Sequence, residues 1–85
     1  MGELMKLPNI GQTVETQLNQ IGIFTAADLQ KAGAKQAWLL IQQIDPSACI
    51  HRLLALEGAI RGVKKTELPD HVKTDLKTFY RQYKL

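Results

Sequence analysis

The side chains that could do acid–base, nucleophilic or metal chemistry are few and widely spaced. The chain has one cysteine, Cys49, and two histidines, His51 and His71, and neither histidine belongs to a metal-ligand spacing. Cys49 and His51 lie two residues apart on one predicted helix, so they point to different faces and form no nucleophile–base pair. We expect a packed cysteine beside a surface histidine, no metal, no cofactor and no enzymatic activity.

Glu57 is the charged residue predicted to lie within an apolar surface. On a helical projection it falls between Leu53 and Leu54, where an unpaired carboxylate would be costly. One interpretation is a perturbed acid in a functional site. The interpretation we favour is a structural anchor, in which Glu57 pairs with Arg61 one turn on or accepts backbone N–H groups from a loop.

A turn near the N-terminus is a candidate phosphate-binding device. In helix-hairpin-helix modules, a tight apolar-glycine turn exposes backbone N–H groups at a helix N-terminus, and these meet a phosphate without reading sequence. The candidate residues here are Asn9, Ile10, Gly11 and Gln12. Asn9 stands where such hairpins usually have a first glycine, and the turn carries no Lys or Arg. The alternative is that Gly11 and Gly22 are turn positions with positive φ.

The C-terminal helix carries a second candidate site. Four basic residues fall within a narrow arc opposite its apolar stripe: Lys73, Lys77, Arg81 and Lys84. We call these four the basic rail, which Lys64 and Lys65 could extend. Such a row could bind phosphates. The alternative is an ordinary solvated face whose charges complement the helix dipole.

The charge of the whole chain agrees with a polyanionic partner without requiring one. The formal net charge is +3, and residues 51–85 carry eight Lys or Arg against four Asp or Glu. The longest apolar run, residues 37–41, is far too short to cross a bilayer, and residues 1–6 do not resemble a secretory signal. We expect a cytoplasmic protein that does not insert into membranes.

Hydrophobic spacing predicts helices and no strands. Apolar residues recur at helical intervals, and capping or stop signals predict helices over about 11–20, 26–33, 34–43, 47–62 and from Pro69 to the C-terminus. Trp38 and Tyr80 could stack on bases, but their spacing among aliphatic residues favours the core. Ala55, Gly58 and Gly62 would let a neighbouring backbone approach. The fold class is therefore all-α, a compact single domain of about five short helices over residues 1–85.

Two blocks of sequence together resemble a known family, the C-terminal domain of TfoX-type proteins. The resemblance covers nearly the whole chain, and Gln12 and Lys65 depart from it where the family usually has proline and an aromatic residue. It is carried by Leu7-Pro8-Asn9-Ile10-Gly11, Leu18, Ile21-Gly22-Ile23, Thr25, Asp28-Leu29, Gly33, Leu53-Leu54-Ala55-Leu56-Glu57-Gly58-Ala59, Gly62 and Leu68-Pro69.

The resemblance implies a compact all-α domain with a helix-hairpin-helix-like N-terminal half. Such domains occur behind a separate N-terminal domain in regulators of DNA uptake competence, or alone, and this chain would be the stand-alone kind. The resemblance implies no catalytic activity. We expect a non-enzymatic module that binds the DNA backbone non-specifically or contacts a DNA-bound regulator. The alternative is a protein-interaction or dimerisation module without nucleic-acid binding, and the oligomeric state stays open.

Overall fold

The computed structural model describes residues 3–85, and within them the chain forms five α-helices and two short 3-10 helices without a strand. The all-α prediction is confirmed. The 3-10 helices, η1 and η2, precede α1 and α5. In chain order the elements are η1 (Glu3–Lys6), α1 (Gln12–Gln20), α2 (Ala26–Ala32), α3 (Ala34–Ile44), α4 (Ile50–Arg61), η2 (Lys65–Glu67) and α5 (Asp70–Tyr83).

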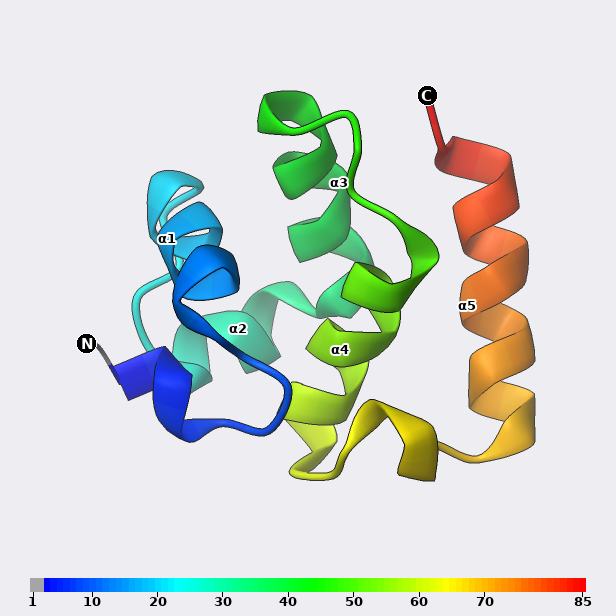
Figure 1. Cartoon of the computed structure of the whole chain (residues 1–85), viewed down its shortest axis with the longest axis horizontal. Helices are drawn as coiled ribbons and strands as arrows, with labels where there is room; N and C mark the ends of the chain where they lie inside the picture. Colours follow the sequence, from blue (N-terminus) through cyan, green and yellow to red (C-terminus); the bar gives the residue numbers. More distant parts are fainter. Residues whose placement is uncertain (1–2) are drawn as a thin grey trace.

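Helix α4 is the central element of the fold. It packs against α2, α3, α5 and η2, and Figure 1 shows it between the α1–α2 side of the molecule and α5. This central position explains why α4 is rich in apolar and small residues, since six of its twelve residues are buried. Its C-terminal end follows the predicted signal, since Gly62 adopts the left-handed conformation (φ 75°) that ends a helix without steric cost.

The core is built around Trp38 of α3, whose side chain is fully buried. The rings of Phe79 and Tyr80 on α5 pack edge-on against it, with centroids 6.1 and 5.5 Å away. This confirms the core assignment of Trp38, whereas Tyr80 is only half-buried. At the far end of the same interface, the buried amide of Gln42 donates to the carbonyl oxygen of Tyr83 and accepts from the amide of Leu85.

Local signals explain most helix boundaries. Thr25 and Asp28 form the predicted capping box at the start of α2: the Thr25 hydroxyl accepts from the Asp28 amide, and the Asp28 carboxylate accepts from the amides of Thr25 and Phe24. These hydrogen bonds, the one from the Phe24 amide above all, hold the pKa of Asp28 below its usual value. The last helix begins at Asp70, with Pro69 as its extended N-cap residue instead of its first residue.

The start of α4 differs from the prediction. The helix begins at Ile50, not near Ser47, because Asp45 forms a turn of its own: its carboxylate accepts from both the amide and the hydroxyl of Ser47. Cys49 is consequently the extended N-cap residue and is exposed. The predicted packed cysteine is therefore wrong, while the surface position of His51 is confirmed.

Candidate nucleic-acid interface

The structure uses the side chain of Asn9 to hold the fold together. Its amide nitrogen donates to the carbonyl oxygens of Val63 (3.0 Å) and Ala55 (3.3 Å), and its amide oxygen accepts from the backbone N–H of Lys65 (3.1 Å). Asn9 has a positive φ of 69°, which asparagine tolerates better than most residues. It therefore takes the backbone conformation for which hairpins commonly use a glycine.

The small residues of α4 make room for this contact. A Cβ added to Gly58 would lie 2.5 Å from the Asn9 amide nitrogen and 2.7 Å from the Val63 carbonyl oxygen. The close approach predicted for this face of the helix is confirmed at Gly58. The N-terminal turn is thus seated directly on the C-terminal half of α4.

The other candidate residues of the turn divide between core and solvent. Ile10 is buried, whereas Gly11 and Gln12 are exposed. Gly11 is the N-cap residue of α1 with φ −97° and ψ −175°, so the positive φ predicted for it is wrong; the positive φ predicted for Gly22 is confirmed at 89°. Residues other than glycine adopt this extended conformation without strain, so a substitution at Gly11 should not strain the turn.

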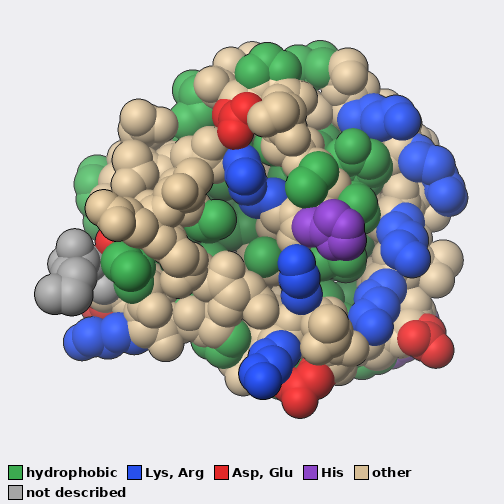
Figure 2. Space-filling model, viewed as in Figure 1, with side chains coloured by type: hydrophobic (Ala, Val, Ile, Leu, Met, Phe, Trp, Pro, Cys, Tyr) green, Lys and Arg blue, Asp and Glu red, His purple; other side chains and the backbone are tan. Residues whose placement is uncertain are grey.

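The basic rail lies along the exposed side of α5 and continues just past its end. Figure 2 shows a row of Lys and Arg side chains over this helix. Lys77 and Arg81 are exposed, while Lys73 is half-buried and its ammonium donates to the Thr66 carbonyl oxygen at 3.1 Å. Lys84 follows the helix as its C-cap residue, and its ammonium lies 5.7 Å from the centre of the Tyr80 ring.

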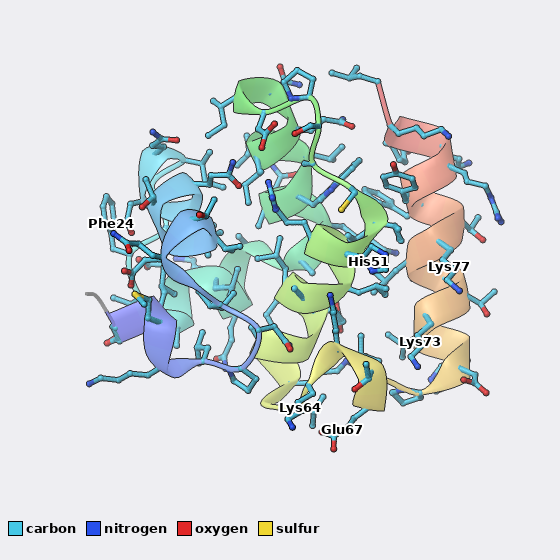
Figure 3. All side chains as sticks on the ribbon, in the orientation of Figure 1. Phe24, His51, Lys64, Glu67, Lys73 and Lys77 are labelled. Carbon is cyan, nitrogen blue, oxygen red and sulfur yellow. The ribbon has the colours of Figure 1, made fainter. Side chains whose placement is uncertain are left out.

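The two proposed extensions of the rail behave differently. The backbone of Lys65 is the one bonded to Asn9, so the N-terminal turn and the basic surface meet at this residue. Lys65 also lines a groove with Lys73 and Lys77. Lys64 is beside an acid instead, since its amide donates to the Glu67 carboxylate and both residues lie at one edge of the molecule in Figure 3.

Ion pairs neutralise basic residues elsewhere on the molecule. Within residues 3–85, three salt bridges form: Lys35–Asp75 (2.8 Å), Arg52–Asp45 (3.0 Å) and Arg61–Glu57 (2.6 Å). None of them involves a member of the rail. Within residues 3–85, no carboxylate therefore forms an ion pair with a lysine or arginine of the rail.

Glu57 pairs with Arg61, the first of the two partners considered for it. The Arg61 Nε donates to a Glu57 carboxylate oxygen, and the side chains keep 45% and 19% of their exposure, respectively. Both residues line a second groove with His71 and the start of α3. Charges in this groove come in both signs, as it also contains the Lys35–Asp75 pair, and a structural role for Glu57 remains our prediction.

Two polar clusters that hold the fold were not anticipated. Glu15 on α1 is buried, and its carboxylate accepts from the Met5 amide, which ties η1 to α1. Asp45 accepts from Gln17 on α1 and from Arg52 on α4. Both connect residues distant in sequence, so helical periodicity carried no signal for them. The structural role of Asn9 was not anticipated either, because the sequence analysis treated this residue only as part of a phosphate-binding turn.

Within the described residues there is no group of three or more His, Cys, Asp and Glu side chains placed to hold a metal ion. The helices among residues 3–85 are also too short or too polar for any of them to span a membrane.

The chain is similar in sequence to a known protein family and to a known protein. Residues 1–80 match the model of the TfoX C-terminal domain. Protein Sxy of Escherichia coli (strain K12) is 36% identical over 66 residues, which are 78% of this chain and 32% of that protein. The chain thus spans about a third of the length of this relative.

Crystal structures of an uncharacterized protein from Listeria monocytogenes share the fold. The triclinic form superposes with a TM-score of 0.92 at 40% sequence identity, covering 93% of this chain and 90% of that chain. The tetragonal form gives 0.90 at 39% identity, covering 93% and 98%. With the family model matching nearly the whole sequence, the chain belongs to the TfoX C-terminal domain family.

Proposed function

We propose that this chain is a non-enzymatic regulatory module that binds the phosphate backbone of duplex DNA through the basic rail. The observation that carries the proposal is the row of basic side chains on α5, of which Lys77 and Arg81 are exposed and unpaired with carboxylates in the described chain. Exposed cations in a row attract phosphates and release the counterions condensed on DNA. A regulatory role is supported by membership of the TfoX C-terminal domain family, since the resemblance implies that such domains occur in regulators of DNA uptake competence.

The same surface favours binding without sequence preference. Lysine and arginine contacts to phosphates position a protein on DNA but carry no base information. The rail lies along the outer side of α5 (Figure 2), where its members present cationic groups. We expect the N-terminal turn to act indirectly, because Asn9 fixes the backbone of Lys65 next to the rail.

The test is a salt titration by fluorescence anisotropy on two unrelated labelled duplexes. The proposal expects weak binding to both, with similar affinities and a steep linear fall of log affinity with log salt. If the protein fails to bind either duplex at low salt, DNA binding is refuted. A large preference for one duplex would instead refute the non-specific mode.

The alternative function, a protein-interaction module, is favoured by a separate observation. Apolar side chains are exposed at the outer ends of α3 and α5, where Ile44 and Tyr83 keep 48% and 50% of their exposure. Exposed apolar surface of this kind often marks contacts between proteins. If no duplex is bound in the titration, this alternative becomes the leading function.

A further inference from the structure

A groove with an apolar floor lies between the first turns of α4, the short helix η2 and the first half of α5. Its volume is about 320 Å³. Figure 3 shows His51, Lys73 and Lys77 on the face of the molecule where α4 and α5 meet. The lining residues are Ile50, His51, Leu54, Lys65, Thr66, Lys73 and Lys77.

The floor and the rim of this groove differ in chemistry. Ile50 and Leu54 on successive turns of α4 supply aliphatic surface, and both are largely covered. Three lysines on η2 and α5 supply positive charge at the rim, and the lining contains no Asp or Glu. Lys73 is held in place by its bond to the Thr66 carbonyl oxygen, which links the two elements that carry the rim.

The nearest acid by sequence does not neutralise this rim. Glu67 on η2 accepts from the Lys64 amide, and in Figure 3 its side chain lies with Lys64 at the edge of the molecule, away from His51 and Lys77. None of the three ion pairs in residues 3–85 involves a lining lysine. The groove therefore combines an unneutralised cationic rim with an aliphatic floor.

This combination fits an anionic ligand that also has aliphatic groups. The backbone of duplex DNA presents phosphates and sugars to a protein and would leave the floor unfilled. Unpaired bases commonly stack on the large aromatic rings of Phe, Tyr and Trp in single-strand sites, and none of these three residue types lines the groove. An acidic peptide matches both the rim and the floor of the groove. Its carboxylates can pair with the lysines of the rim, while a leucine or isoleucine side chain covers the floor.

We propose that this groove binds an acidic peptide segment of a partner protein, with an aliphatic side chain seated on Ile50 and Leu54 and carboxylates paired with Lys65 and Lys77. The inference goes beyond DNA binding and rests on the groove alone. The groove shares Lys73 and Lys77 with the rail, so the peptide and DNA should compete where both bind.

The experiment measures binding of fluorescein-labelled synthetic peptides by anisotropy. The probe alternates glutamate with leucine, and a matched peptide has serine in place of each leucine. The protein variants are Lys65→Gln/Lys77→Gln in the groove and, as a control with the same change of charge, Lys31→Gln/Lys64→Gln outside it. None of these four ammonium groups takes part in an ion pair within residues 3–85, so both variants should fold, which circular dichroism checks.

The proposal expects the leucine peptide to bind the wild type and the control variant with similar affinity. The groove variant should lose roughly tenfold or more in affinity, because two paired cations are removed. The serine peptide should bind much more weakly than the leucine peptide to the wild type. In addition, Arg81→Gln should leave peptide binding unchanged, since Arg81 does not line the groove.

Three results would overturn the inference. They are no binding of the leucine peptide, equal binding of the leucine and serine peptides, or equal losses in the groove and control variants. A duplex measured in parallel separates the two proposals. Duplex binding without peptide binding overturns the groove inference alone, and peptide binding without duplex binding overturns the proposed DNA function alone.

Discussion

Asn9 connects the N-terminal turn to the end of α4 with both ends of its side-chain amide. It satisfies two backbone carbonyls and one backbone N–H that lie more than forty residues away in sequence. Buried backbone groups that lose such partners carry a desolvation cost. The position of Lys65, where the turn meets the basic surface, thus depends on one asparagine.

Replacing Asn9 tests this role. We expect Asn9→Ala to lower the free energy of unfolding by about 1–3 kcal/mol, because three hydrogen bonds are lost and alanine is strained at φ 69°. Asn9→Gly loses the same bonds without the strain, so its cost should be smaller. Urea unfolding followed by circular dichroism measures both, and equal stability of wild type and Asn9→Ala would contradict the assignment.

Gly58 provides a second test at the same contact. We expect Gly58→Ala to destabilise the protein by about 1–3 kcal/mol, although alanine is the better helix former, because its Cβ would collide with Asn9 and the Val63 carbonyl. The matched control is Gly11→Ser, whose Cβ would meet nothing within 4 Å and whose hydroxyl could cap α1. A thermal melt should rank Gly58→Ala well below both the wild type and the control, and any other order would refute the close packing.

At the scale of elements, the connection between α3 and α4 depends on Asp45. Its carboxylate accepts from the Ser47 hydroxyl, from the Gln17 side chain on α1 and from Arg52 on α4. These donors, the Ser47 hydroxyl above all, hold the pKa of Asp45 well below its ordinary value of 3.8. The Asp45 side chain therefore connects the end of α3 to α1 and α4, and its turn with Ser47 places the start of α4 at Ile50.

The lowered pKa predicts the pH dependence of stability. A carboxyl group whose pKa is lower in the folded state stabilises the protein above its unfolded pKa and loses that contribution as pH falls through the folded pKa. We expect the urea midpoint to fall on acidification below about pH 4, and to fall less steeply in Asp45→Asn. Asp28, whose pKa is also lowered, should keep part of the slope in the variant. Parallel acid profiles for the two proteins would contradict the role of Asp45.

Sequence patterns predicted the elements well because each helix carries its own signals. Periodic apolar residues, the Thr25–Asp28 box and Gly62 are local, so the number and approximate bounds of the helices follow from them. The prediction for Gly11 failed because Asn9, two residues earlier, takes the positive φ of the turn. The prediction for Cys49 failed because Asp45 and Ser47 form a turn that shifts the start of α4 to Ile50. For the candidate site, the rail could be found by periodicity, but the groove could not, because η2 and α4 are brought to α5 by tertiary packing.

At the scale of the whole molecule, the distribution of unpaired positive charge sets one face apart from the rest of the surface. Residues 51–85 hold eight of the eleven Lys and Arg residues, and ion pairs form away from the rail. A net charge of +3 alone would not indicate a DNA-binding protein. The arrangement of these charges on one face (Figure 2) is what supports a phosphate contact.

The most direct measurement of this claim compares the salt dependence of duplex binding in the wild type and in Lys77→Gln/Arg81→Gln. Both residues are exposed and make no ion pair in the described chain, so the variant should keep its fold and stability. If their side chains contact phosphates, the slope of log affinity against log salt should become shallower by about two. An unchanged slope in a folded variant, with binding as tight as that of the wild type, would contradict the account.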